Sequence, residues 1–212
     1  MSYTVSPIHN EDYFVKLAKT LEDMGASAIC VKDMANLLLP MDAYSLIKRL
    51  KETVSIPIHL HTHNTTGTGD MVNLMAAMAG VDIVDCAIDS MSSTTSQPSM
   101  NAVVASLNGQ ERDTGLDSGK LQKLSDYWSD VRERYASFET GIKNPSTDIY
   151  RYEIPGGQYT NLQPQVESLG LGHRFAEVKE MYRTVNLMLG DIIKVTPSSK
   201  VVGDLAIFMV QN

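Results

Sequence analysis

The alternation of strand-like and helix-like segments over the first ninety residues constrains the fold most strongly. Short apolar segments are joined by amphipathic segments that are long enough to form helices. Strands connected in this way pair in parallel through right-handed crossovers, which indicates an α/β fold. The segments are, in chain order, helix 10–24, strand 27–33, helix 40–53, strand 56–62, helix 68–79 and strand 81–88.

The pattern changes near residues 92–98, and the rest of the chain is predicted to be mostly helical. Three parallel strands cannot close a barrel, and an eight-stranded (β/α) barrel usually needs ~250 residues. Two arrangements are open at this point: a small open sheet, or a chain that starts in the middle of a larger barrel. The helices expected after the change are 99–107, 117–137, 159–168, 173–190 and 197–210.

One predicted strand carries three histidines at alternate positions, His59, His61 and His63. They share a face opposite Ile58 and Leu60, and burying such polar rings is costly unless something binds them. Neighbours on one face lie about 6.5 Å apart, so two imidazoles can share one metal ion. Functional groups of barrels lie at the C-terminal strand ends, which selects His61 and His63 as ligands and leaves His59 in support. Three hydrogen-bonded structural histidines are the alternative.

The preceding predicted strand ends in Lys32, which shares a face with Ala28 and Cys30. A lysine at that strand end can reach a metal held by the histidines of the next strand. A protonated ammonium is no ligand, but an unprotonated lysine can add CO2 and become an anionic carbamate, which is one. The alternative is a simple ion pair of Lys32 with Asp33 or Asp85.

Charge and composition exclude several classes of function. The net charge of −7 argues against a nucleic-acid groove, which needs clustered Lys and Arg. No apolar run reaches the ~18 residues that span a bilayer, and the first residues lack a secretory signal. Cys30 and Cys86 lie in apolar runs, so buried thiols of a cytoplasmic protein are expected rather than a disulfide.

Several longer motifs together resemble the carboxyltransferase domain of the pyruvate carboxylase family. They occur in family order and cover nearly the whole chain. The motifs are VKDMANLL, PIHLHTHNTTG, AGVDIVDCAIDSM with TSQPS, EIPGGQYTNLQ, GLGHRFAEVKEMYRTVN and GDIIKVTPSSKVVGDLAIFMVQN. The resemblance implies the C-terminal part of a TIM-type (β/α)8 barrel in residues 1–95, followed by a mostly helical extension in 96–212.

The resemblance also implies a reaction and a metal. The expected function is transfer of a carboxyl group from carboxybiotin to pyruvate, which forms oxaloacetate for anaplerosis and gluconeogenesis. The family holds zinc or manganese with a carbamylated lysine, two histidines and an aspartate. The first three fall on Lys32, His61 and His63. The aspartate and the pyruvate-holding groups belong to barrel strands outside this sequence, so the 212-residue chain alone is expected to be inactive.

The TPSSK motif is expected to supply the biotin-facing half of the site. By resemblance, Thr196 moves a proton between the pyruvate methyl group and the biotin ureido nitrogen, while Ser199, Lys200 and Gln158 face biotin. Taken without the family, Thr196 is predicted to be the N-cap of a helix, with Pro197 in its first turn.

The resemblance places the other components of the reaction elsewhere. Biotin is carried on another domain, ATP is used at another domain, and the full enzyme is expected to form a homo-tetramer. Neither nucleic acid nor a membrane is expected as a partner.

Three rival functions remain open on the sequence alone. An oxaloacetate decarboxylase or transcarboxylase subunit shares the lysine, histidine and threonine motifs, although the QYTN run at 158–161 favours pyruvate carboxylase. A metal-dependent aldolase or lyase barrel shares the histidine pair but not TPSSK. A fragment that acts only in assembly is a third possibility, because a three-stranded sheet leaves an open edge and an apolar face.

Two positions depart from the family pattern. Asn64 stands where the family has the aspartate of HDTSG, and Asn36 stands where it has the glycine of KDMAGL. Neither change removes a proposed ligand. Loss of the acid at position 64 is expected to weaken a contact that supports the metal ligands.

Overall fold

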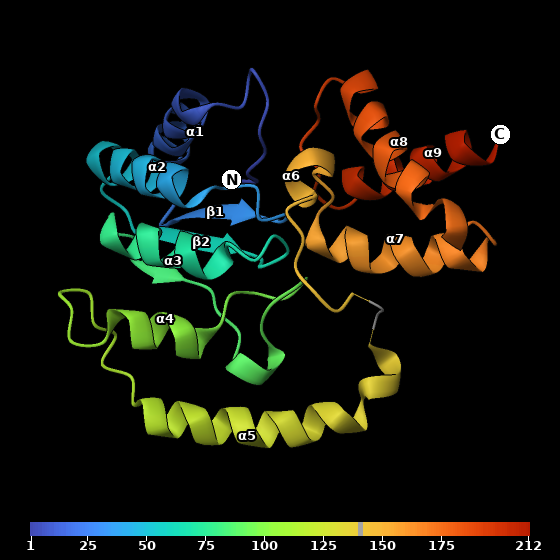
Figure 1. Ribbon diagram of the computed structural model, residues 1–212. Helices are drawn as coiled ribbons and strands as arrows, with labels where there is room; N and C mark the ends of the chain where they lie inside the picture. Colours follow the sequence, from blue (N-terminus) through green and yellow to red (C-terminus); the bar gives the residue numbers. More distant parts are fainter. Residues whose placement is uncertain (140–141) are drawn as a thin grey trace.

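The computed structural model describes residues 1–139 and 142–212 and alternates helices with strands in its first part. These elements are α1 (Glu11–Asp23), β1 (Ile29–Asp33), α2 (Pro40–Thr53), β2 (Ile58–Thr62), α3 (Gly69–Met78), β3 (Ile83–Val84) and η1 (Asp89–Met91). The later elements are α4 (Met100–Leu107), α5 (Ser118–Arg134), η2 (Ala136–Phe138), α6 (Ile149–Tyr152), α7 (Gly156–Ser168), η3 (Gly172–Arg174), α8 (Phe175–Met188) and α9 (Ser198–Gln211). Figure 1 shows α6–α9 beside the strands and α5 beneath them.

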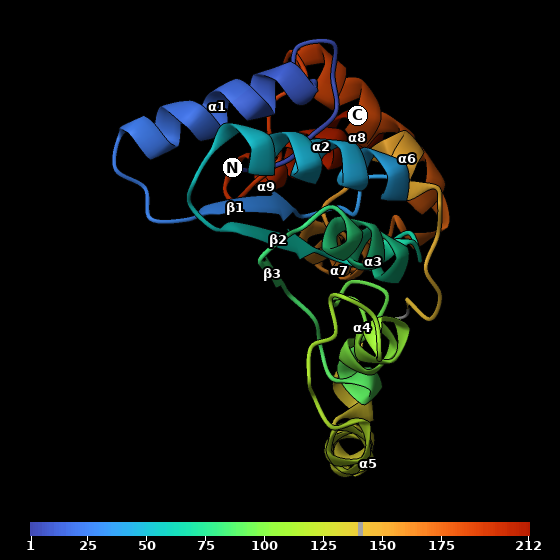
Figure 2. The same cartoon turned by 90° about the vertical axis from the view of Figure 1, so that its left-hand side faces the viewer.

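The three strands form one parallel sheet in the order β1–β2–β3, which confirms the expected α/β fold. On one face the side chains of Ile29, Val31, Ile58 and Leu60 are at most 2% exposed. They form a single apolar core with α1, α2 and α3. Figure 2 shows α1 and α2 lying over the strands. The opposite face is left to the polar residues that alternate with this apolar set.

Capping residues set the ends of the first helices where the sequence places them. The Asn10 side chain accepts a hydrogen bond of 3.0 Å from the Tyr13 amide and so caps α1. Gly25 follows the end of α1 with φ +94°, a conformation that costs glycine little. Pro40 is the first residue of α2, which spans the expected range 40–53.

The third strand is much shorter than the expected range 81–88. Only Ile83–Val84 pair with β2, and the Asp85 amide adds one further bond to the Leu60 carbonyl at 3.0 Å. Beyond Asp85 the backbone bonds elsewhere, because the Ala87 amide donates to Pro98 and the Ala87 carbonyl accepts from Met100. Because the backbone of Ala87 is hydrogen-bonded to Pro98 and Met100, it cannot pair with β2, and β3 ends early.

Helices α7, α8 and α9 enclose a second apolar core. Helix α7 begins at Gly156 rather than Tyr159, because Pro155 already accepts the first helical hydrogen bond from the Tyr159 amide. The short helix α6, which the sequence pattern does not predict, ends at Glu153 in a left-handed conformation.

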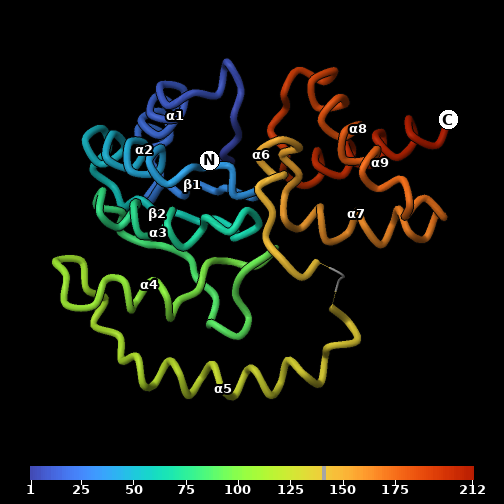
Figure 3. The backbone as a smooth tube through the Cα atoms, viewed as in Figure 1, coloured from blue at the N-terminus to red at the C-terminus, as the bar shows by residue number. Residues whose placement is uncertain are grey.

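Helix α5 stands apart from both cores. Figure 3 traces it along the lower edge, where it contacts η1 and α4. Within residues 1–139 and 142–212, no helix is both long and apolar enough to cross a membrane.

Helix α9 begins at Ser198, so the prediction that Thr196 is its N-cap is wrong. The Ser198 hydroxyl closes a turn instead: it accepts from the Val195 amide at 3.0 Å and donates to the Ile193 carbonyl at 2.7 Å. The Pro197 carbonyl then accepts the first helical bonds, from Lys200 and Val201. Thr196 is therefore an exposed residue just before the helix.

The helical part joins the sheet at the C-terminal ends of β1 and β2. The Gly156 amide donates to the Met34 carbonyl at 2.8 Å, and the Ser146 amide donates to the Thr65 carbonyl at 2.8 Å. Ile149 of α6 packs against Ala35 and Leu37, which follow β1. These contacts bring the beginning of α7 over the strand ends where barrel chemistry is expected.

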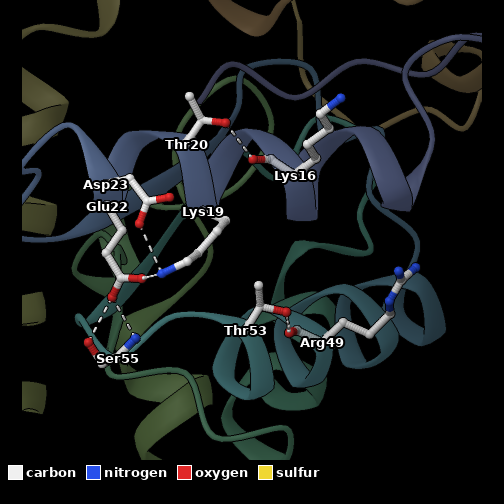
Figure 4. A network of polar contacts seen from close by, with 8 residues as sticks. All are labelled: Lys16, Lys19, Thr20, Glu22, Asp23, Arg49, Thr53 and Ser55. Carbon is white, nitrogen blue, oxygen red and sulfur yellow. Dashed lines mark hydrogen bonds and ion pairs between the residues drawn. The ribbon is translucent and has the colours of Figure 1, made fainter.

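The opposite end of the sheet is closed by polar contacts between α1 and the loop before β2. One oxygen of Glu22 accepts from both the amide and the hydroxyl of Ser55 at 2.7 Å, and the other accepts from Lys19 at 2.8 Å (Figure 4). Hydrogen bonds from Lys19 and Ser55 lower the pKa of Glu22 from its usual value to about 2.

Glu22 should therefore make unfolding dependent on acid. A carboxyl whose pKa is lowered by folding stabilises the protein fully above its unfolded pKa and loses that effect as pH falls through the folded value. We expect the difference in melting temperature between the wild type and Glu22→Gln to be largest near pH 6, to shrink as the pH falls towards 2 and to be lost below it. Asp23→Asn, which removes only one contact to Lys19, is the matched control. A Glu22→Gln difference that does not change over this range would contradict the prediction.

Candidate active site

Lys32 and His61 are direct neighbours in the β1–β2 ladder. In parallel strands, paired residues point to the same face, here the one opposite the apolar core. His63 follows the end of β2, and its ring centre lies 5.3 Å from that of His61 with the two planes nearly perpendicular. The expected trio thus converges at one end of the sheet.

The His63 ring is oriented by the backbone. Its Nδ1 lies 2.6 Å from the Thr95 carbonyl, and because a carbonyl only accepts, Nδ1 carries the proton. Burial lowers the pKa of His63 and outweighs the opposing effect of the Thr95 carbonyl, while the charges of His61 and Lys32 lower it further. The neutral ring therefore keeps a free lone pair on Nε2.

His61 and His59 are both bound by the carboxylate of Asp85. One oxygen lies 2.8 Å from His59 Nε2 and the other 2.7 Å from His61 Nδ1. Partial burial alone would raise the pKa of Asp85, but the hydrogen bonds from His61 and His59 outweigh it and lower the pKa. Asp85 thus links His59 to His61.

These donors fit a divalent metal. Both His61 and His63 have Nδ1 occupied by a hydrogen-bond acceptor, the usual arrangement of histidines that bind metal through Nε2. Within residues 1–139 and 142–212, no cluster of three or more His, Cys, Asp or Glu side chains is able to hold a metal. Lys32, which is paired with His61 across the β1–β2 ladder, is the lysine of this strand end.

Lys32 has no carboxylate partner among the described residues. The Asp33 carboxylate instead accepts from the Leu37 and Leu38 amides at 2.9 and 3.0 Å. Asp85 is taken up by the two histidines. The simple ion pair considered as the alternative for Lys32 is thus not formed.

A cavity of about 390 Å³ connects the strand ends with the helical part. A cavity of similar size, about 410 Å³, lies near Asp82 and Arg112 but contains no histidine. The 390 Å³ cavity is lined by six residues of the sequence motifs: Lys32, His61, His63, Gln158, Thr196 and Ser199.

Lys200 does not line this cavity. Its side chain is 65% exposed and pairs with Asp204 at 2.7 Å, one turn further along α9. The Thr196 hydroxyl, by contrast, makes no hydrogen bond within the described part of the chain and lines the cavity.

Two glycines that the sequence analysis did not single out make room for site residues. A Cβ on Gly156 would lie 3.1 Å from His63 Nδ1, and one on Gly203 would lie 2.5 Å from Gln158 Nε2. Each glycine could have been noticed in the sequence: Gly156 is the second residue of Pro-Gly-Gly, and Gly203 lies inside an apolar helix. The contacts of the two glycines were not predictable from the sequence, because they depend on how α7 packs against its neighbours.

The two departures from the family pattern are accommodated locally. Asn36 adopts φ +56°, a conformation that asparagine tolerates. Its buried side-chain carbonyl accepts a hydrogen bond from the Thr66 backbone amide at 3.2 Å. The Asn64 side-chain amide nitrogen donates to the Asp70 carboxylate at 3.1 Å, and the Asn64 side-chain carbonyl accepts from the Gly69 backbone amide at 2.9 Å. An aspartate at position 64 would place two carboxylates in contact.

Comparison with known proteins decides the family. A family described as HMGL-like matches residues 3–127, which is more than half of the chain. The chain belongs to the HMGL-like family. A second family, described as a conserved carboxylase domain, matches residues 149–212 of this HMGL-like protein.

Relatives of this HMGL-like chain include pyruvate carboxylases. That of Staphylococcus aureus is 56% identical over 207 residues, covering 98% of the chain and 18% of the relative. Human mitochondrial pyruvate carboxylase is 49% identical over 203 residues, covering 94% of the chain and 17% of the relative. The chain thus spans less than a fifth of the length of these relatives.

Solved structures agree with this assignment. The carboxyl transferase domain from Rhizobium etli pyruvate carboxylase matches with a TM-score of 0.98 and 47% identity, over 100% of this chain and 36% of that one. The same domain with pyruvate and biocytin matches with a TM-score of 0.97 and 48% identity, over 99% of this chain and 36% of that one. The resemblance to pyruvate carboxylase carboxyltransferase domains is confirmed, and with it the barrel-type fold.

The contact of Gly203 with Gln158 is directly testable. In Gly203→Ala, the new methyl group must displace the flexible Gln158 amide, while alanine favours the helix by about 1 kcal/mol. We expect the melting temperature to be unchanged or raised and the Gln158 side-chain amide signals to move in a ¹H–¹⁵N spectrum. Gly157→Ala, whose methyl group would meet open space, is the control. Unmoved Gln158 signals in Gly203→Ala would contradict the packing.

Proposed function

We propose that this chain supplies the metal-binding and biotin-facing part of the carboxyltransferase site of a biotin-dependent pyruvate carboxylase. The observation that carries the proposal is the single cavity that joins Lys32, His61 and His63 to Thr196 and Ser199. The matches to pyruvate carboxylases over nearly the whole chain support it.

The proposed reaction moves one carboxyl group and one proton. The C–N bond of carboxybiotin breaks, and a new C–C bond forms at the methyl carbon of pyruvate to give oxaloacetate. Thr196 takes the methyl proton and returns one to the biotin ureido nitrogen, which a hydroxyl can do when both partners lie within hydrogen-bond reach. A divalent metal held by His61, His63 and carbamylated Lys32 would polarise the keto oxygen of pyruvate.

The residues around Thr196 are proposed to bind biotin. Ser199 and Gln158 line the same cavity and are assigned to the ureido group. Lys200 points to Asp204 in this structure, so its proposed contact with biotin requires the side chain to leave that ion pair. The pair is solvent-exposed and of the kind that contributes little stability, which makes such a movement inexpensive.

The wider assignments rest on the family. We propose zinc or manganese as the metal, biotin carried on another domain and ATP used at a further domain. The full enzyme is proposed to be a cytoplasmic homo-tetramer, with this chain divided into a barrel part at 1–95 and an extension at 96–212. The crystal structure of a complete multifunctional pyruvate carboxylase from Rhizobium etli, 47% identical to this chain, supports the presence of further domains.

Substitution of Lys32 should affect one of the two half-reactions of such an enzyme and not the other. In the full-length carboxylase, Lys32→Ala should abolish carboxyl transfer to pyruvate because it removes the carbamate ligand, while ATP-dependent carboxylation of biotin remains. Lys48→Ala, an exposed lysine on α2, is the control and should leave both activities unchanged. Equal loss of both half-reactions in Lys32→Ala would show a structural role.

Thr196 tests the proton transfer. Thr196→Ala in the full-length enzyme should lose pyruvate carboxylation by at least ~100-fold, the effect typical of removing a proton-transfer group. Its melting temperature should not change, because the hydroxyl makes no helix cap. Thr196→Ser keeps the hydroxyl and should retain most activity. Near-normal carboxylation by Thr196→Ala would eliminate the proton-transfer role.

A further inference from the structure

The Asp85 carboxylate lies between two histidines of the neighbouring strand and uses one oxygen for each. Its backbone is fixed at that position: the Asp85 amide donates to Leu60, between the two histidines in sequence, at 3.0 Å. The Asp85 carbonyl accepts from the buried Asn73 side chain at 3.1 Å. The carboxylate is thus held against both rings by α3 and β2 together.

This contact determines which ring nitrogens carry protons. An ionised carboxylate only accepts hydrogen bonds, so each nitrogen facing Asp85 must be a donor. His59 donates from Nε2, whereas His61 donates from Nδ1. The two rings therefore differ in tautomer, and His61 keeps its lone pair on Nε2. His63 has the same tautomer as His61, imposed by the Thr95 carbonyl.

We propose that Asp85 is a positioning residue that holds His61 in the Nδ1–H tautomer, so that its Nε2 is available to a metal ion. His59 braces the carboxylate from the other side and is not itself a ligand. The proposal deepens the metal site of the proposed function and rests on it. The tautomer itself can be measured in the metal-free chain.

The geometry distinguishes this role from a direct one. His59 lies two residues further into the strand than His61, and its Nε2 is already occupied by Asp85. Both Asp85 oxygens are likewise occupied by the rings. Both groups therefore act on a metal through His61.

Imidazole tautomers are read directly from long-range ¹H–¹⁵N spectra of the 212-residue chain. Asp85→Asn leaves one acceptor oxygen and introduces an amide donor, so the two rings can no longer both donate. We expect either His59 or His61 to lose its present tautomer in Asp85→Asn, because only one ring can face the remaining oxygen, while His63 keeps its own tautomer and serves as an internal reference. Asp82→Asn, at the other end of β3, is the matched control and should leave His61 unchanged.

Metal affinity gives a second readout. Titration with Zn²⁺ should show weaker binding for Asp85→Asn by about 10–100-fold, the range typical of removing a partner of a ligating histidine. His59→Gln should keep both the His61 tautomer and the Zn²⁺ affinity, because Asp85 still accepts from His61. This variant tests the proposal even if Asp85→Asn does not fold.

Two results would overturn the proposal: unchanged tautomers of both His59 and His61 in Asp85→Asn, or a loss of Zn²⁺ affinity in His59→Gln as large as that in Asp85→Asn. The second would make His59 a ligand. Failure of the proposed reaction would appear in the pyruvate carboxylation assay and not in these measurements, so the two hypotheses fail separately.

Discussion

Burial of one face of β1 and β2 against α1–α3 is the constraint on which the rest of the structure depends. Side chains alternate along a strand, so burying Ile29, Val31, Ile58 and Leu60 leaves no choice about the other face. Lys32 and His61 are turned to that face and, through the parallel register, stand next to each other. The apolar residues therefore orient the polar ones, although they touch no substrate themselves. A slip of one residue in β2 would reverse both faces at once.

The second requirement is that the helical part lies across the strand ends. The bond from Gly156 to Met34 and the packing of Ile149 on Ala35 and Leu37 are short-range contacts between segments more than a hundred residues apart in sequence. They place α7 so close to His63 that a Cβ at position 156 would lie 3.1 Å from His63 Nδ1, and a larger residue there would press on the ring. The cavity exists because two separately packed cores meet at this joint.

Most features that depend on interactions between residues close in sequence could be predicted, whereas those that depend on contacts between distant segments could not. The strand faces, the Asn10 cap of α1, the start of α2 at Pro40 and the convergence of His61 with His63 depend on local periodicity and nearest neighbours, and they were predictable. The Asp85 bridge was not, because it requires the register of β3 on β2. The start of α9 was misjudged, because the Ser198 hydroxyl bonds backwards into its own turn. The ion pair of Lys200 with Asp204 likewise depends on which side of α9 faces the cavity.

The position of the Glu22–Ser55 contact has a consequence for how such a protein can change over time. It lies before β2, whereas Lys32, His61, His63 and Thr196 gather at the opposite ends of the strands. The length of the strands thus separates the Glu22–Ser55 contact from the candidate site. A substitution at this contact can therefore change the acid dependence of unfolding without touching a residue that lines the cavity, so a lineage can adjust the first and leave the second as it is.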